Sequence, residues 1–216
     1  MTEQLSLKAG QVLGAMIVET TRNMAVAAVA VAGLTAIDLV SVQLSIQGSM
    51  IISGMASLTS QYFVTRFALD RAGLLPAGFT GRFGSFWGMN IVTNLATVLG
   101  LLLLIVPGLY LAARWFIAAP SILAEDRTAG EGMGESWERM KGSVWHVLAA
   151  ILVLYLSGFG LAMAPQFFVA EDNLPMALQI FSSFASSVTI VLGWLMAVGA
   201  YRLTVQPEES LAEIFA

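Results

Sequence analysis

The sequence predicts an all-α membrane protein, a bundle of six transmembrane helices with three amphipathic helices lying at the membrane interface. Two observations support this fold class. Hydrophobic residues make up 57% of the 216-residue chain and charged residues only 11%, which leaves too little polar surface for a water-soluble domain of this length. Long apolar segments also recur along the whole chain, with the charges gathered between them. We therefore expect residues 1–216 to form a single integral membrane domain.

The segment Ile91–Ala124 sets the topology of the rest of the chain. It contains one charged residue, Arg114, and it is longer than the ~20 residues that one helix needs to cross a ~30 Å hydrocarbon layer. Pro107 and Gly108 form the strong turn signal in its middle. The sequence therefore predicts a tight hairpin of the third and fourth membrane helices, joined at this dipeptide.

The N-terminal part of the chain predicts one interfacial helix and two spans. Apolar residues recur at helical spacing over Ser6–Thr21, while polar residues occupy the other face, which is typical of a helix lying in the interface. Met24–Val42 is the first span. Met50–Ala68 is the second, and serines on one of its faces allow close approach of a neighbouring helix.

Two further interfacial helices are predicted. Phe79, Phe83 and Phe86 follow one another at spacings of four and three, which indicates a short amphipathic lead into the third span, starting near Phe86. The charged segment after Arg127 contains an apolar stripe at helical spacing, made of Met133, Trp137, Met140 and Val144.

The C-terminal part predicts the last two spans, Val144–Met163 and Ala177–Tyr201, followed by an acidic, loose cytoplasmic tail at residues 203–216. The chain also shows traces of an internal repeat of one interfacial helix and two spans. Two short patterns occur twice: GSFW at 84–87 with GSVW at 142–145, and Tyr-x-x-x-Arg ending at Arg66 and at Arg114. We predict three hairpin-like units, at about 5–71, 79–127 and 130–202.

Basic residues lie on one side of the predicted bundle. In the six-span topology, the segments on the N-terminal side hold Lys8, Arg22, Arg71, Arg82, Arg127, Arg139 and Lys141. The opposite loops hold no Lys or Arg. Because the bias of Lys and Arg between loops sets orientation, both termini should be cytoplasmic.

Arg114 is the charge that this topology places within the membrane. It lies about 9 Å from the outer end of its helix, where a bare charge costs at least ~2.5 kcal/mol. Asp38 should reach a similar depth, so we expect an ion pair between the two. A packing clamp or snorkelling side chain is the alternative structural interpretation, and a substrate or ion pathway is the functional one.

Two more groups of residues are candidates for binding. Asn90 and Asn94 are one helical turn apart, so they share a face that could hold a polar ligand or form hydrogen bonds between helices. Near the cytoplasmic surface, Arg22, Arg82, Arg139 and Lys141 could contact anionic lipid headgroups, at about 1 kcal/mol each.

The sequence contains none of the common signatures of catalysis. The chain has no cysteine, and we find no nucleotide-binding loop, dinucleotide fingerprint, nucleophile elbow or zinc motif. We therefore expect neither an enzyme nor a cofactor or metal. The net charge of −4 gives no indication of nucleic-acid binding.

The central part of the chain resembles a known family. Pro107, Gly108, Tyr110, Arg114, Pro120, Glu125, Ser136 and Trp137 match a pattern in which a Pro-Gly-hydrophobic-Tyr turn precedes an Arg-containing span and a Ser-Trp helix. This pattern resembles the membrane domain attached to some bacterial glycerophosphoryl diester phosphodiesterases, and it is similar to related YciC-like inner-membrane proteins. The soluble phosphodiesterase barrel is absent from the chain. The resemblance implies a bacterial inner-membrane module without an assigned reaction.

The sequence thus leaves two functions open. The first is a membrane module that engages lipid, including anionic phospholipid, or another membrane protein or a second copy of itself. The alternative is a small transporter or channel whose pathway contains Arg114, Asp38, Asn90 and Asn94.

Overall fold

The computed structural model describes residues 7–41, 43–79, 81–103, 105–167, 175–206 and 214, and its regular elements are all helical. In chain order they are α1 (Ala9–Arg22), α2 (Met24–Ser41), α3 (Ile46–Arg71), α4 (Phe83–Leu103), α5 (Ile105–Arg114), α6 (Ala118–Ala124), α7 (Ala129–Arg139), α8 (Val144–Met163), the short 3₁₀ helix η1 (Ala164–Phe167) and α9 (Met176–Val205). The predicted all-α class is confirmed.

Within the residues that the structure describes, five helical segments are long and apolar enough to cross a membrane, whereas the sequence predicts six spans. They are Met24–Ser41, Phe83–Leu102, Ile105–Ala124, Val144–Phe167 and Met176–Val205. The predicted second span, within α3, is not among them, although its 26 residues would extend roughly 39 Å. Its Ser53, Ser57 and Gln61 line cavities inside the bundle, and these side chains lower its hydropathy.

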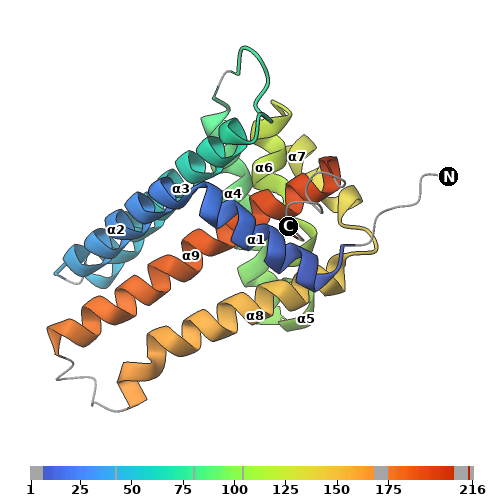
Figure 1. The fold of residues 1–216 in the computed structure, drawn as a ribbon. Coiled ribbons are helices and arrows are strands. Elements are labelled where there is room, and N and C mark those ends of the chain that lie inside the picture. Colours follow the sequence, from blue (N-terminus) through green and yellow to red (C-terminus); the bar gives the residue numbers. More distant parts are fainter. Residues whose placement is uncertain are drawn as a thin grey trace.

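Two of the three predicted interfacial helices exist as separate elements. Helix α1 lies across α9 and α8 (Figure 1), with Val12 and Ala15 buried beneath it. Helix α7 begins at a capping box in which the Thr128 hydroxyl accepts a hydrogen bond from the Glu131 backbone and the Glu131 side chain accepts one from Thr128.

The middle interfacial helix was predicted wrongly. Phe79 lies in a loop, and Phe83 and Phe86 belong to the first turn of α4. Gly78 and Gly81 have φ angles of +80° and +93°, in the left-handed region where a helix ends rather than continues. The predicted threefold repeat therefore stays a prediction, since the middle unit lacks its own interfacial helix.

The central hairpin turns three residues earlier than predicted. Helix α4 ends at Leu103 and α5 begins at Ile105, so Pro107 stands in the first turn of α5, where its missing N–H costs no hydrogen bond. Gly108 instead allows close packing: a Cβ added at Gly100 would lie 2.8 Å from the Gly108 Cα. Helix α5 ends at Arg114, and a turn separates it from α6, which interrupts the predicted fourth span.

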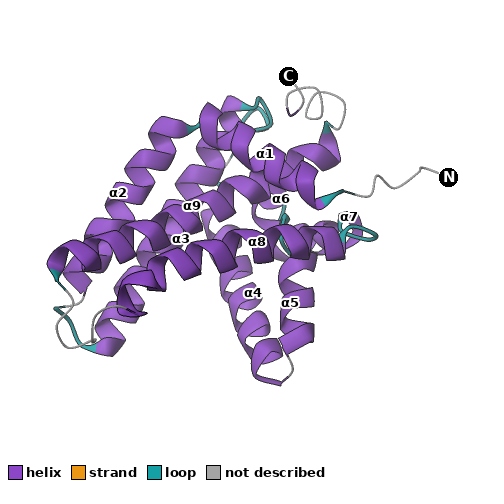
Figure 2. Ribbon diagram, turned by 60° about the horizontal axis from the view of Figure 1, so that its bottom comes forward, coloured by secondary structure: helices purple, strands orange, loops and turns teal. Residues whose placement is uncertain are grey.

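The hairpins meet at one end of the molecule and separate toward the other. Figure 2 shows the α4–α5 hairpin pointing away from α2, α3, α8 and α9. At the shared end, which also carries α1, α6 and α7, the packing is dense; fully buried side chains there include Phe86, Ile117, Ile122, Leu123, Met140, Leu195 and Tyr201. Large apolar side chains on the separated parts are exposed, as expected for surfaces that face hydrocarbon.

Candidate functional site

A polar cavity of about 310 Å³ lies between α3, α4, α8, α9 and the segment that joins α5 to α6. None of the described residues that line it is charged. Its polar and amphipathic side chains are Ser57, Gln61, Asn90, Thr93, Asn94, Thr97, Trp115, Tyr155 and Trp194. We call this the central cavity.

Asn90 and Asn94 share a wall of the central cavity, as their spacing predicted. The Nδ2 of Asn90 donates to the Phe86 carbonyl at 3.0 Å, and the Nδ2 of Asn94 donates to the Asn90 carbonyl at 2.8 Å. Both amides therefore bond along their own helix and not to a neighbouring one. Their side-chain carbonyl oxygens have no hydrogen-bond partner among the described residues, and can accept from a ligand.

Thr97 adds a second unsatisfied group to this wall. Its hydroxyl oxygen is buried and makes no hydrogen bond within the described chain, which is costly unless water or a ligand supplies a partner. Gln61 and Tyr155 complete the polar lining from α3 and α8. Sequence reasoning missed both, although Tyr155 is the one aromatic hydroxyl inside the predicted fifth span.

A second, smaller cavity of about 170 Å³ surrounds Asp38, and we call it the Asp38 cavity. Helices α2, α3 and α9 form it, and its polar residues are Asp38, Ser53, Ser57, Ser183, Ser186 and Ser187. The Ser183 hydroxyl donates to the Asp38 carboxylate at 2.5 Å. Ser57 lines both cavities.

The predicted ion pair between Asp38 and Arg114 is wrong. Arg114 is 6% exposed, and its guanidinium donates to the Trp137 carbonyl at 2.8 Å. The guanidinium also lies 4.3 Å from the Trp137 ring centroid and 5.5 Å from that of Tyr110. Arg114 is the last residue of α5 and contacts Trp137 of α7 at the dense end of the bundle. Asp38 lies instead in the cavity between α2, α3 and α9. The packing-clamp interpretation of Arg114 matches this geometry.

Three further residues of the family pattern, Tyr110, Ser136 and Trp137, contribute to the same contacts. The Ser136 hydroxyl donates to the Arg114 carbonyl at 2.8 Å. Helix α7 therefore contacts both the backbone and the guanidinium of Arg114. Tyr110, Arg114, Ser136 and Trp137 together join α5 to α7.

The four basic residues predicted to contact lipid headgroups all have acidic partners. Their pairs are Arg22 with Glu19 at 3.4 Å, Arg82 with Asp126 at 2.7 Å, Arg139 with Glu135 at 2.7 Å and with Glu125 at 2.8 Å, and Lys141 with Glu138. The hydrogen bond to Asp126 raises the pKa of the Arg82 guanidinium. These pairs offset the positive charge that would attract an anionic headgroup.

Two polar contacts at the dense end, one buried and one partly buried, were not predicted. Glu19 in α1 is 1% exposed and forms an ion pair with Arg202 in α9. Glu125 accepts a hydrogen bond from the Tyr201 hydroxyl at 2.8 Å. Burial alone would raise the pKa of Glu125, but this hydrogen bond and the charges of Arg139 and Arg127 hold it below its ordinary value. Neither contact has a local sequence signal, because its partners are distant in the chain.

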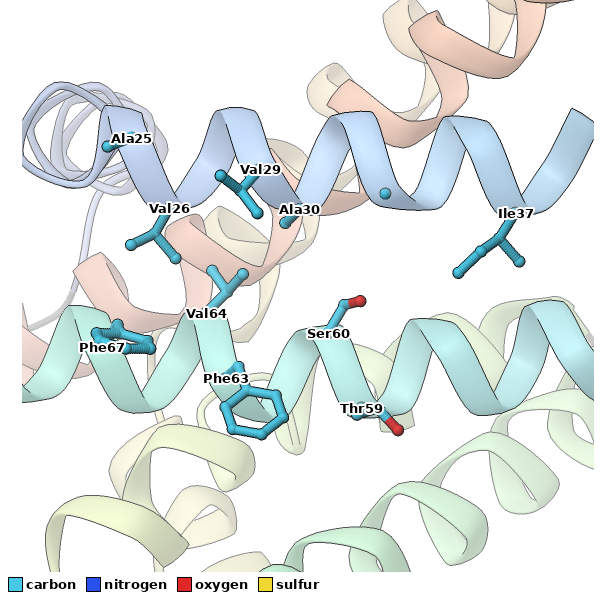
Figure 3. Close-up of a pocket in the computed structure, with 11 residues that line it drawn as sticks. Ala25, Val26, Val29, Ala30, Ile37, Thr59, Ser60, Phe63, Val64 and Phe67 are labelled. Atoms are coloured by element: carbon cyan, nitrogen blue, oxygen red, sulfur yellow. The ribbon is translucent and has the colours of Figure 1, made fainter.

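Apolar grooves lie along the separated parts of the bundle. Figure 3 shows one of about 510 Å³ between α2 and α3, where Val26 and Ala30 on α2 face Val64 on α3. A similar groove of about 500 Å³ lies between α2 and α9. Such surfaces suit acyl chains rather than a polar ligand.

Comparison with known proteins gives one match. A family model described as the membrane domain of glycerophosphoryl diester phosphodiesterase matches residues 89–198, which confirms the resemblance seen in the sequence. No curated protein and no solved structure matches the chain.

Proposed function

Because the chain belongs to the family of the membrane domain of glycerophosphoryl diester phosphodiesterase, we propose that it is a membrane module that binds lipid and holds the polar part of the lipid in the central cavity. The polar wall of that cavity, among otherwise apolar spans, is the observation that supports this function. This function requires no catalytic group, and it does not include phosphodiesterase activity.

The lining of the central cavity indicates which part of a lipid it would hold. Its acceptors are the side-chain carbonyl oxygens of Asn90 and Asn94, and the described lining carries no cation to balance a phosphate. Hydroxyl or ammonium donors of a headgroup therefore fit better than an anionic group. A volume of about 310 Å³ equals the space of roughly ten water molecules, enough for a group the size of glycerol.

The arrangement of the hairpins supports entry from the membrane. The α4–α5 hairpin leaves the other helices toward its tip (Figure 2), so a headgroup could pass between α4 and its neighbours without crossing the dense end. The acyl chains would stay in the hydrocarbon, where grooves such as that between α2 and α3 are apolar.

The proposed topology keeps α3 as a sixth span and places both termini in the cytoplasm of a bacterial inner membrane. In support, α1, α6 and α7 gather at the end that carries the basic residues, including Arg82, Arg139 and Lys141. The bias of basic residues favours the cytoplasmic side for that end.

Native mass spectrometry of the gently solubilised protein tests lipid binding. We expect wild-type protein to retain lipid and the double variant Asn90→Leu/Asn94→Leu, which removes the two acceptors at similar volume, to lose it. The control variant Arg82→Gln/Lys141→Gln should retain lipid, because both residues already pair with acids. Loss of lipid in the control but not in the cavity variant would instead assign binding to the basic residues and contradict the proposal.

A pathway for a small polar solute is the second candidate function. The two cavities follow one another along α3 and α9. Ser53 on α3 and Ser187 on α9 line the Asp38 cavity, and Gln61 on α3 and Trp194 on α9 line the central cavity. Ser57 lines both cavities. Arg114 takes no part in this pathway, in contrast to the prediction. In proteoliposomes, glycerol should then permeate faster with wild-type protein than with Ser57→Trp, and equal rates would exclude the pathway.

A further inference from the structure

Among the described residues, no Lys, Arg or His side chain lines the cavity that holds the Asp38 carboxylate. Asp38 is half-buried between α2, α3 and α9. The contact that the structure gives its carboxylate is the hydrogen bond from Ser183. By contrast, Asp126 and Glu135 at the dense end each pair with an arginine. A carboxylate within a membrane segment normally has such a partner.

Serine side chains from α3 and α9 line the same cavity as this carboxylate. Ser183 and Ser187 lie one turn apart on α9, are 9% and 4% exposed, and line the same cavity. Ser187 makes no hydrogen bond within the described residues, so its hydroxyl oxygen is available to a ligand in the cavity. Ser53 approaches from α3, where its hydroxyl lies 3.4 Å from that of Ser41.

We propose that the Asp38 cavity binds a monovalent alkali cation, and that Na⁺ is held by the Asp38 carboxylate and the hydroxyls of Ser183 and Ser187. Oxygen atoms of carboxylates and hydroxyls are ligands of hard cations, and serine hydroxyls can rotate to turn a lone pair toward an ion. A single carboxylate balances one positive charge, whereas divalent sites usually gather several. About 170 Å³ accommodates an ion with several of its waters.

This site is separate from the proposed lipid site. Asn90 and Asn94 line the central cavity and not the Asp38 cavity, so the loss of lipid binding in their variants would leave cation binding intact. The two proposals can therefore fail independently.

Thermal unfolding in detergent tests the cation site. NaCl should raise the Tm of wild-type protein in a saturable manner when choline chloride keeps the ionic strength constant. Asp38→Asn, which keeps the shape of the side chain, should abolish this rise. The matched control Asp70→Asn changes an exposed acid in the last turn of α3, outside the Asp38 cavity. This variant should keep the full rise of Tm with NaCl.

A second variant guards against general destabilisation by Asp38→Asn. Ser187→Ala should raise the Na⁺ concentration at half-maximal effect about tenfold. At saturating Na⁺, its Tm should stay close to that of the wild-type protein. A Na⁺ response that survives in Asp38→Asn, or no difference between Na⁺ and choline, would overturn the proposal. A Tm that depends on pH but not on Na⁺ would also overturn it, since the carboxylate would then take up a proton.

Discussion

Arg114 joins two helices through contacts that a single substitution can remove. Its guanidinium stacks on Trp137 and donates to the Trp137 carbonyl, while its own carbonyl accepts from Ser136. Four residues of the family pattern, Tyr110, Arg114, Ser136 and Trp137, therefore make structural contacts between α5 and α7.

Replacing Arg114 by Ala should lower the free energy of unfolding by about 2–4 kcal/mol, because a desolvated cation–π contact and a charged hydrogen bond are both lost. Arg114→Lys should recover only part of this, since Lys lacks the planar group that stacks. Thermal unfolding in detergent measures both. Asp38→Asn is the control, and if it restored the stability of Arg114→Ala, the original ion-pair prediction would be correct instead of the clamp.

Glu125 makes a stability contribution that depends on pH. The hydrogen bond from Tyr201 and two arginines overcome the effect of burial and lower its pKa in the folded state. A lowered pKa means that the stabilisation is complete above the ordinary value of 4.5 and is lost as the pH falls through the folded-state pKa. Between pH 7 and pH 3, wild-type protein should therefore lose more stability than Glu125→Gln. Parallel curves for the two proteins would show that Glu125 makes no such contribution.

At the scale of helices, small residues decide how closely neighbours approach. Helices α4 and α5 approach at Gly100 and Gly108, and α1 approaches α9 where a Cβ on Gly199 would lie 2.9 Å from the Ala15 carbonyl carbon. The buried pair of Glu19 and Arg202 lies near that second contact, so α1 is attached to α9 by both shape and charge.

Gly100→Ala should destabilise the central hairpin by about 1–3 kcal/mol, because its Cβ would meet the backbone of Gly108 and push the helices apart. Gly88→Ala is the matched control on the same helix, since a Cβ there has no atom within 4 Å and the substitution raises helix propensity. Equal melting temperatures for the two variants would rule out this close contact.

At the scale of the whole molecule, dense packing and polar cavities occupy different regions. The α1, α6 and α7 end is closely packed and rich in ion pairs, whereas most of the residues that line the central cavity belong to α3, α4, α8 and α9. On the proposed function, the ligand binds between hairpins that remain joined at one end.

The absence of cysteine from the chain allows a direct test of topology. A single cysteine at Gln43, in the loop between α2 and α3, should react with an impermeant maleimide added to intact cells. A cysteine at Gly130, exposed at the start of α7, should react only after lysis. If α3 did not cross the membrane, the two positions would lie on the same side, so labelling of both under one condition would contradict the six-span topology.

Much of the fold could be predicted because hydropathy and helical spacing are local properties. The predicted fifth span, Val144–Met163, has the bounds of α8, and the hairpin of α4 and α5 was expected from one Pro-Gly pair. The connection between the two helices falls earlier than Pro107. Proline is compatible with the first turn of a helix, so a proline can indicate the start of a helix as well as the loop before it. The middle interfacial helix failed for a related reason: the glycines after Pro76 outweighed the spacing of three phenylalanines.

The sequence by itself determined the helical class, the shared face of Asn90 and Asn94, and the family. Only the tertiary structure decided which side chains meet. It separated Asp38 from Arg114, gave each of the four predicted lipid-contacting basic residues an acidic partner, and joined α3 with α9 around two cavities. The physical reason is that spacing along one helix follows from its 3.6-residue period, whereas contacts between helices depend on where each turn falls and on how each pair of helices crosses.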